Sequence, residues 1–421
     1  MRVHLCILSQ QVLQNILPLC RLEADYVYLA ASEEMIKQSK DKQFRQLLVD
    51  LGIVDDFDKV RVLDSMPSYK FEQMRKWALQ QMQFVFENVP KARIVLNATG
   101  GTKLMSLALI DVCRELEGEH QVDIIYCDTI NDQLENIYPV VYTETLASDL
   151  LKTKDIIKAH SIRINRAASA HPEWQKDVET RRELSFHLGQ HMGSKLGSFI
   201  ATLNKSLANE FADKLEETHF PLTISLGSGV SKDWNYVLRL MDHLELIKLK
   251  ADLQGHKPAV FSISSLEAAR YLHGGWLEEY LWLCFKEAGI SDVQSCVQIT
   301  SLHDNVGFKD NELDLIASNR NNLVIVECKT ANMSHQQVLN RALDKLSALS
   351  SRSGGLLAER WFATARWPQD DETDEAGNNL AEKFRLQAKD QNVVLIEPRH
   401  LNNLVERLKV WKKTSRFPLQ N

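Results

Sequence analysis

The stretch 311–330 combines two apolar runs with charged residues whose spacing could do chemistry. Three of these charged residues are Asp314, Glu327 and Lys329. Two short apolar runs in this stretch are joined by an Asn-rich segment, 318–322, which predicts a β-hairpin. Because side chains alternate along a strand, Glu327 and Lys329 share one face of the second strand, and Asp314 can lie opposite them on the first.

Such a trio needs compensation inside an apolar hairpin, because burying unpaired charges costs several kcal/mol. A divalent metal held by the two carboxylates would supply it. Lys329 would then lie next to the metal, where it could polarise a phosphate or orient a water molecule. The alternative interpretation is an ordinary amphipathic hairpin that carries a salt bridge.

The hairpin resembles the active-site hairpin of the PD-(D/E)xK nucleases. The resemblance implies that Asp314 and Glu327 are metal ligands and that Lys329 is the catalytic lysine. It also implies a third carboxylate on the preceding helix, where the sequence offers Glu278 and Glu279. Adjacent helix positions lie about 100° apart, so only one can face the site, and we prefer Glu278. The implied metal is Mg2+ or Mn2+.

Residues 1–145 alternate short apolar runs with helical patterns, which predicts a parallel sheet with helices on both faces, a Rossmann-like domain. The expected strands are 3–8, 26–30, 60–63, 94–96 and 122–126, and the expected helices are 10–19, 33–51, 67–88 and 102–116. Ligands bind such sheets at the carboxyl ends of the strands. The loops after the first and fourth strands are therefore the candidate binding loops.

The loop after the fourth strand reads Asn-Ala-Thr-Gly-Gly-Thr-Lys over residues 97–103. Paired glycines let a backbone approach a ligand closely, and the hydroxyls, the helix amides and the lysine can donate to phosphate or ribose. The spacing matches neither a Walker loop nor Gly-x-Gly-x-x-Gly. Ser9 and Gln10 follow the first strand and would line the same crevice. A tight turn with a helix cap is the alternative interpretation.

The order of these two motifs along the chain is similar to that of the CARF-domain nucleases of type III CRISPR systems. The resemblance implies a homodimer that binds a cyclic oligoadenylate, most often cyclic tetra-adenylate, and thereby activates a nuclease that cuts single-stranded DNA and RNA or nicks duplex DNA. The residues it implies as ring contacts are Ser9, Gln10, Asn97, Thr99, Gly100, Gly101, Thr102 and Lys103.

We therefore expect an α/β protein of three parts: a Rossmann-like CARF domain at 1–145, a helical and winged-helix-like connector at 146–263, and a PD-(D/E)xK restriction-endonuclease-like domain at 264–421. In the connector, a helical pattern at 174–214 precedes a hairpin across Gly255. We favour packing or dimerisation over DNA binding for this segment, because no arginine-rich recognition helix stands out.

The C-terminal part should contain a helix at 265–288, a strand at 293–299, the hairpin, a helix at 334–349, and strands at 361–365 and 393–396. Polar residues on the helix at 334–349 could reach a nucleic-acid backbone; they are Gln336, Gln337, Arg341 and Lys345. His303, His335 and His400 are interpreted as structural, because carboxylate and lysine chemistry requires no histidine.

Composition limits the remaining possibilities. With 44% hydrophobic and 25% charged residues the chain is typical of a globular protein, and no apolar run approaches a membrane span. The formal net charge of −6 provides no general basic field for nucleic acid. Seven scattered cysteines without a Cys-x-x-Cys pair favour the reduced cytoplasm and argue against structural zinc.

Two other functions fit parts of the sequence. A constitutive DNA repair or restriction nuclease would use the C-terminal half and would need no activator. A ligand-responsive transcription regulator would use the N-terminal domain and the winged segment, but it leaves the acidic and lysine residues of the hairpin without a role.

Overall fold

The chain folds into two compact units, which are described separately. The first comprises residues 1–163 and 353–356, and the second comprises 164–352 and 357–421. The predicted division into three domains at 145 and 263 stays a prediction. The computed structural model describes residues 1–117, 120–211, 219–226, 230–250, 259–302, 311–331, 336–355, 358–368, 372–373 and 377–419.

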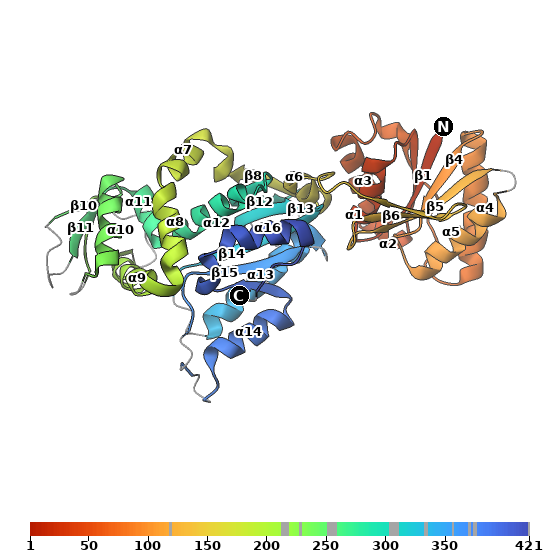
Figure 1. Ribbon diagram of the computed structural model, residues 1–421. Coiled ribbons are helices and arrows are strands. Elements are labelled where there is room, and N and C mark those ends of the chain that lie inside the picture. The colour runs from red at the N-terminus through yellow and green to blue at the C-terminus, as the bar shows by residue number, and fades with distance from the viewer. Residues whose placement is uncertain are drawn as a thin grey trace. The chain divides into compact units, whose positions relative to one another are not determined.

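The first unit is built on a seven-stranded sheet with the order β3-β2-β1-β4-β5-β6-β7 (Figure 1). Its first five strands are parallel, and β6 and β7 continue the sheet as an antiparallel hairpin. The strands are β1 (Arg2–Ile7), β2 (Tyr26–Ala30), β3 (Val60–Val62), β4 (Arg93–Asn97), β5 (Gln121–Asp128), β6 (Gln133–Tyr138) and β7 (Tyr142–Thr145). The Rossmann-like prediction is confirmed.

Helices lie between the parallel strands, which explains why β1, β2 and β4 are continuous apolar runs: both faces of the sheet are covered. The helices of this unit are α1 (Leu13–Arg21), α2 (Glu33–Lys37), α3 (Lys40–Asp50), α4 (Phe71–Asn88), α5 (Lys103–Glu115) and α6 (Thr153–Ala159). The single helix predicted at 33–51 is two helices, because Ser39 adopts a left-handed backbone conformation with φ 56° between them.

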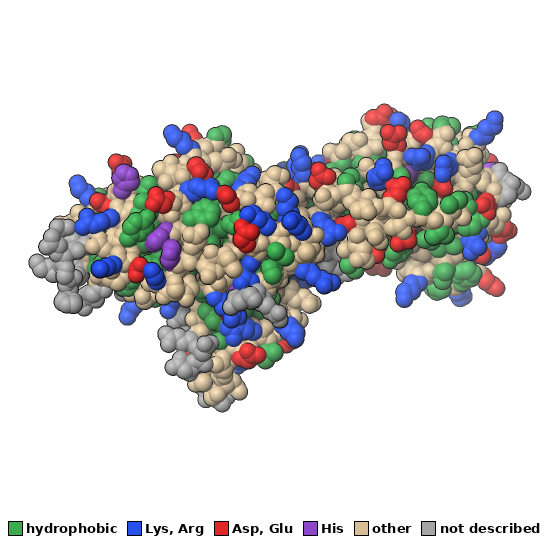
Figure 2. All heavy atoms as spheres, in the orientation of Figure 1, with side chains coloured by type: hydrophobic (Ala, Val, Ile, Leu, Met, Phe, Trp, Pro, Cys, Tyr) green, Lys and Arg blue, Asp and Glu red, His purple; other side chains and the backbone are tan. Residues whose placement is uncertain are grey.

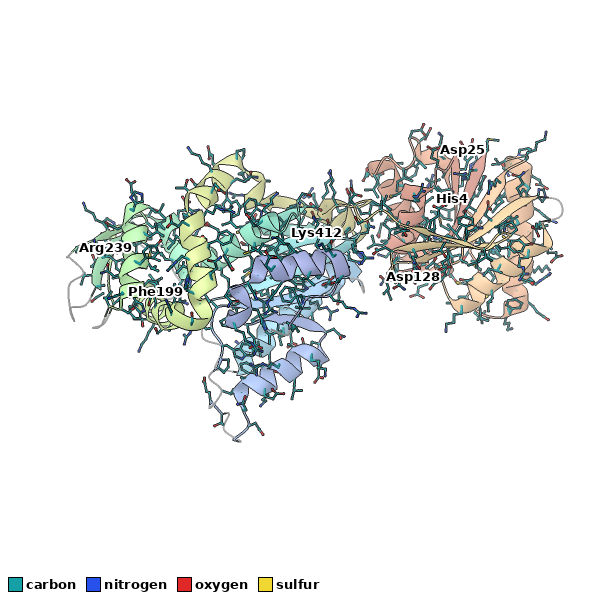
Figure 3. All side chains as sticks on the ribbon, in the orientation of Figure 1. His4, Asp25, Asp128, Phe199, Arg239 and Lys412 are labelled. Carbon is teal, nitrogen blue, oxygen red and sulfur yellow. The ribbon has the colours of Figure 1, made fainter. Side chains whose placement is uncertain are left out.

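A buried histidine makes the stability of this unit depend on pH. His4 lies on β1 with a fully buried side chain, labelled in Figure 3, and burial lowers its pKa from 6.5 to about 4. Between these values the unfolded chain holds the proton more tightly than the folded chain does. The contribution of His4 is therefore fully present above pH 6.5 and is lost as the pH falls towards 4.

We expect this histidine to lower the free energy of unfolding by about 2 kcal/mol between pH 7 and pH 5. Urea unfolding at both pH values measures the effect, and His4→Leu should remove this part of the pH dependence. The exposed His171 supplies a control variant, His171→Leu, which should keep the full dependence. An unchanged difference between the two pH values in His4→Leu would refute this assignment.

The second unit contains a six-stranded sheet with the order β16-β15-β14-β13-β12-β8. Strands β12, β13 and β14 are antiparallel neighbours, whereas β14, β15 and β16 run parallel. The strands are β8 (Ile162–Ala167), β12 (Val293–Ser301), β13 (Asn311–Asn319), β14 (Asn322–Lys329), β15 (Glu359–Thr364) and β16 (Val393–Ile396). The predicted hairpin is confirmed as β13 and β14, joined through Arg320 and Asn321, which both have positive φ.

A smaller antiparallel sheet, β10-β11-β9, belongs to the same unit. Its strands are β9 (Leu222–Leu226), β10 (Ile247–Leu249) and β11 (Ala259–Ile263), and the helix before β10 is α10 (Lys232–His243). The predicted pair of strands is present as β10 and β11. The side chains of this region share one hydrophobic core with the larger sheet, for example Phe261, Trp276 and Trp361.

The helices of the second unit surround this core. They are α7 (Pro172–Thr180), α8 (Arg182–His191), α9 (Gly197–Phe211), α11 (Leu266–Arg270), α12 (Trp276–Glu287), α13 (Gln336–Gly354), α14 (Leu380–Asp390), α15 (Pro398–Leu401) and α16 (Leu404–Thr414). The single helix predicted at 265–288 is wrong: a π-helical turn, Tyr271–Gly275, separates α11 from α12, and the backbone at Gly274 is not helical.

Positive and negative side chains are mixed on the visible surface, and no large patch of one sign stands out. Figure 2 shows Lys and Arg side chains interspersed with Asp and Glu over both units. None of the described helices is long and apolar enough to cross a membrane. All seven cysteines are free thiols.

Candidate functional site

The hairpin brings the predicted charged residues together at the end of β14. Lys329 Nζ donates a hydrogen bond to Glu327 Oε1 at 2.6 Å, which places both on one strand face as the alternation predicts. Glu327 itself is 3% exposed. Asp314 on β13 accepts the backbone N–H of Cys328 through Oδ2 at 2.7 Å. This bond links the two strands at the level of the acidic residues.

Lys345 on α13 is a second cation at Glu327. Its Nζ lies 3.3 Å from Oε1 and 3.2 Å from Oε2 of that carboxylate. The sequence suggested nucleic-acid contact for Lys345, and nothing in a polar helix pattern indicated which side chain would turn towards the hairpin. The structure shows that this lysine balances the buried Glu327 charge together with Lys329. Gln336 and Gln337, on the same helix, were predicted with Lys345 to reach a nucleic-acid backbone. Their side chains lie outside the described part of the structure.

Glu278 on α12 approaches the same site from the other side of the hairpin. Its Oε2 accepts a hydrogen bond from Cys296 Sγ at 3.1 Å, and the charge of Asp314 acts on it. Glu279 is turned away and is bound by Arg181, whose Nη2 lies 2.8 Å from Oε1. The two adjacent carboxylates thus have different environments, one beside the hairpin acids and one in a buried ion pair.

The kink before α12 is what positions Glu278. The carbonyl of His273, in the π-helical turn, accepts a hydrogen bond from Thr330 Oγ1 at 3.1 Å. Thr330 directly follows Lys329, and its own carbonyl accepts Asn204 Nδ2 at 2.8 Å. The start of α12 is therefore attached to the end of β14, which fixes one carboxylate relative to the others.

The ionisation of this cluster is strongly perturbed. Burial, together with the charge of Asp314, raises the pKa of Glu278 to about 8. Burial and the charge of Glu327 raise the pKa of Asp314 to about 6. Burial alone would lower the pKa of Lys329, but Asp314 and Glu327 outweigh it and raise the pKa above its usual value. The two acids therefore favour the protonated form of Lys329.

These acids fit a hard divalent cation by the chemistry of their donors. The raised pKa values of Glu278 and Asp314 show that the surrounding protein does not neutralise the two carboxylates, and carboxylate oxygens are the ligands that Mg2+ and Mn2+ prefer. Among the described residues no three His, Cys, Asp or Glu side chains form a ready-made metal cage. That is compatible with Mg2+, which usually takes one or two carboxylates and completes its shell with water and substrate oxygens.

A cavity of about 730 Å3 opens beside Glu278. Cys296, Glu312 and Gln298 line it from β12 and β13, and Arg166 lines it from β8. Cys296 adopts a positive φ of 50° within β12, an uncommon conformation for a residue other than glycine. Glu278 is therefore open to a space large enough for a small ligand.

The histidines considered in the sequence are not part of this cluster as far as it is described. His400 is buried, and its Nδ1 lies 3.1 Å from the backbone N–H of Glu397 at the start of α15. It therefore caps a helix. His303 and His335 lie outside the described residues.

In the first unit, the two candidate loops meet where the strand order reverses. β1 pairs with β4, with Cys6 opposite Asn97, so the segments that follow both strands are neighbours. A Cβ on Gly100 would lie 2.1 Å from the carbonyl oxygen of Ile7, and Gly101 has φ +72°. Both glycines are needed because the loop packs directly against the end of β1.

Asn97 and Thr99 hold this loop in place. Asn97 is fully buried; its Nδ2 donates to the Gln14 carbonyl at 2.8 Å, and its Oδ1 accepts from Thr99 Oγ1 at 2.7 Å. The Thr99 hydroxyl oxygen also accepts the backbone N–H of Cys127 at 2.7 Å. The Asn97 side chain offers no exposed atom to a ligand, so its role in the loop is internal.

The exposed donors of the loop stand at the start of α5. Thr102 caps the helix, its Oγ1 accepting the Met105 N–H at 3.3 Å, and Lys103 is the exposed first residue. On the neighbouring loop, Gln10 is exposed and donates to Gln38 Oε1, whereas Ser9 Oγ is engaged with Gln11 and Gln14. Helix amides and a lysine thus lie at the carboxyl ends of β1 and β4, the edge at which phosphate groups bind in such sheets.

Comparison with known protein families accounts for both sites. Residues 3–155 match the family described as the Card1 CARF domain, and residues 265–415 match the Card1-like endonuclease domain. The chain belongs to the Card1-like CARF endonucleases. The expected CARF domain and the expected nuclease domain are therefore both present, in the predicted order, and the protein is an endonuclease by family.

Solved structures share the fold of the whole Card1-like chain. Protein VC1899 from Vibrio cholerae is 18% identical, with 99% of each chain covered and a TM-score of 0.75. Can2 from Sulfobacillus thermosulfidooxidans, solved in complex with cyclic tetra-adenylate, is 20% identical, with 97% of each chain covered and a TM-score of 0.71. No curated protein matched the chain.

Proposed function

We propose that this protein is a metal-dependent nuclease that a cyclic oligoadenylate activates, as part of type III CRISPR defence in the cytoplasm. One observation carries the proposal: a single chain combines a Thr-Gly-Gly-Thr-Lys loop at the switch point of a CARF sheet with an acidic cluster and a lysine on a nuclease hairpin. The solved relative Can2 was determined with cyclic tetra-adenylate. We infer the same class of ligand for this chain.

The proposed catalytic residues are Glu278, Asp314, Glu327 and Lys329. Asp314 and Glu327, with Glu278 directly or through a water molecule, would hold Mg2+ or Mn2+, which would supply an activated water and stabilise charge on the phosphate oxygens when bound. Lys329 remains protonated, because the neighbouring acids raise its pKa. Its role is to balance negative charge on the scissile phosphate. Lys345 contacts both oxygens of the buried Glu327 carboxylate and holds it in place.

The proposed ligand site lies at the loop between β4 and α5. The amides at the start of α5, the Thr102 backbone and Lys103 lie at the carboxyl end of the sheet and suit the phosphates of a cyclic oligoadenylate. Gln10 and Ser9, in the loop after β1, would contact the same ligand. Asn97, Thr99 and the two glycines give the loop its shape. The coupling requires that the ring bind the active arrangement of the protein better than the idle one.

We further propose that the protein acts as a homodimer through the face of α5. Leu104 and Leu107 are exposed by 46% and 53% and lie one turn apart on the helix that begins at the candidate loop. A second copy seated on this face would cover both leucines. An isologous interface there would bring two identical loops together around one ring with two-fold symmetry.

Leu107→Asp should convert the dimer to a monomer and abolish activation by the ring. A carboxylate in a self-complementary apolar interface meets its own copy, and burying such a pair is unfavourable. Light scattering coupled to size exclusion measures the oligomeric state. Leu386 on α14 is similarly exposed, so Leu386→Asp serves as the control and should remain dimeric. A Leu107→Asp protein that is still dimeric would contradict the assignment of this face.

Isothermal titration calorimetry with cyclic tetra-adenylate tests the sensor directly. We expect one ring bound per two chains, because each subunit supplies one copy of the loop. Binding of one ring per chain would rule out the shared site. Absence of heat with rings of four and of six nucleotides would contradict the proposed ligand class.

A further inference from the structure

A second cavity opens at the carboxyl end of the nuclease sheet, beside the strand that ends in Lys329. β14 and β15 are parallel neighbours, with Lys329 opposite Thr364. The pairing continues one residue further, since the N–H of Ala365 donates to the carbonyl of Lys329 at 2.9 Å. Ala365, Arg366 and Trp367 then form one wall of a cavity of about 750 Å3.

We call this cavity the arginine groove, after the three arginines that line it: Arg366, Arg385 and Arg399. The acid among its lining residues is Glu397, which is 4% exposed and is bound by Arg385 at 2.8 Å and by Arg399 at 3.1 Å. Three positive charges therefore face one negative charge. The groove carries an excess of positive charge in a protein whose net charge is −6.

Arg366 is the arginine of the groove that is most available to bind a ligand. It is half-buried, and within the described part of the chain its guanidinium forms no ion pair or hydrogen bond. Its backbone is fixed, because Thr364 Oγ1 donates to the Arg366 carbonyl at 2.7 Å. The charge of Glu372 acts on this guanidinium without forming an ion pair with it. A fixed, partly buried guanidinium held in no ion pair can bind an anion, especially a phosphate.

The opposite wall leaves room for an extended ligand. It consists of the start of α9 and the π-helical turn before it, Met192–Leu196, and it presents the small residues Gly193, Ser194, Gly197, Ser198 and Ala201. Gly193 packs tightly on α15, since a Cβ there would lie 3.1 Å from the Pro398 carbonyl oxygen. Apart from the buried Met192, the small side chains of this wall leave the groove open.

Trp367 adds an aromatic surface to the groove. Its ring packs edge-on against Phe384 at 5.9 Å, with the Arg385 guanidinium 5.7 Å from its centre. The indole Nε1 is buried without a hydrogen-bond partner among the described residues. Arginines that follow a strand of phosphates, combined with an aromatic ring on which a base can stack, are the features of single-stranded nucleic-acid sites.

We propose that the arginine groove holds the substrate strand on one side of the cleavage site, with Arg366 and Arg399 on phosphates and Trp367 stacking a base. This inference rests on the proposed nuclease function and adds to it a strand-binding site. The position favours a continuous strand over a free phosphate. The groove is lined by Ala365, whose N–H donates to the Lys329 carbonyl, so the groove and the strand that carries Lys329 end at the same edge of the sheet.

Fluorescence anisotropy with labelled single-stranded DNA and RNA, in the presence of a chelator, measures strand binding without cleavage. We expect Arg366→Ala to weaken binding about tenfold and to reduce the slope of log K against log salt by about 0.7, the loss of one phosphate contact. Trp367→Leu should weaken binding to a similar extent, whereas Trp367→Phe should retain most of it. Inorganic phosphate, added at millimolar concentration, should not displace the strand.

Lys413→Ala is the matched control, because Lys413 is exposed at the end of α16 and does not line the groove. Equal binding by Arg366→Ala and Lys413→Ala, with active wild-type enzyme, would overturn the groove and leave the nuclease function intact. A wild-type protein that neither binds nor cuts a strand would overturn both. Displacement by inorganic phosphate alone would show a simple anion site and would also overturn the strand-binding proposal.

Discussion

Glu327→Gln is expected to lower the rate of metal-dependent cleavage about a hundredfold or more, the loss that follows removal of one charged group from a preorganised site. Glu327 is almost fully buried and faces both Lys329 and Lys345. A neutral amide would bind a metal poorly and would leave two lysines without their counter-charge. The rate is measured with a labelled single strand at saturating Mn2+ and activator.

The control for this variant is Glu406→Gln, which removes an equally charged but exposed residue of α16 and should leave the rate unchanged. Thermal unfolding of both variants separates loss of catalysis from loss of the fold. Glutamine still accepts hydrogen bonds from the two lysines, so the hairpin should persist. Cleavage by Glu327→Gln at more than half of the wild-type rate would refute the catalytic assignment.

Lys103→Ala is expected to raise the concentration of cyclic tetra-adenylate needed for half-maximal activation by at least about tenfold. A hydrogen bond to a charged group is worth about 1.5–3 kcal/mol, or about 10–100-fold in affinity. In a dimer both subunits would lose the same contact with one ring, so the loss of binding free energy occurs twice per bound ring. Lys103 is exposed at the start of α5, where a phosphate also meets the helix amides.

Lys91→Ala provides the comparison for the sensor. Lys91 precedes β4 and therefore lies at the opposite end of that strand from the candidate loop. Its removal changes the charge of the CARF domain equally and should leave activation unaltered. If the two lysine variants respond to the activator alike, the loop between β4 and α5 is not the ligand site.

The sequence predicted the two candidate sites best where a regular pattern of apolar residues, or a pair of glycines, lies at the site itself. Alternation in 322–329 placed Glu327 and Lys329 on one face, and the structure confirms it through their hydrogen bond. The parallel strands of the first unit were visible as continuous apolar runs, and the reversal of strand order places the predicted loops side by side. Both family domains were predicted in the correct order.

Features that depend on tertiary contacts were beyond sequence reasoning. Strand β6 buries Leu134 and the polar Asn136, and β7 buries no residue, so neither strand shows an alternation of apolar residues in the sequence. The break before α12 arises at Gly274, next to Thr330, a contact between residues far apart in the chain. The approach of Lys345 to Glu327 likewise depends on how α13 packs against the hairpin.

The positional role of Asn97 was also not evident from the sequence. As part of a glycine-rich loop it was expected to contact the ligand, yet its amide is buried beneath the loop and bound to Asn15 and Gln14. A polar residue at the end of a buried strand is equally suited to holding a loop as to binding a ligand. Only its exposure distinguishes the two roles.

The central claim is that the ring controls the nuclease. Its most direct test is cleavage of a labelled single-stranded DNA and a supercoiled plasmid by the purified protein with Mn2+, with and without cyclic tetra-adenylate. We predict cleavage only in the presence of the ring. Equal cleavage without it would contradict the account and identify a constitutive nuclease of the repair or restriction type.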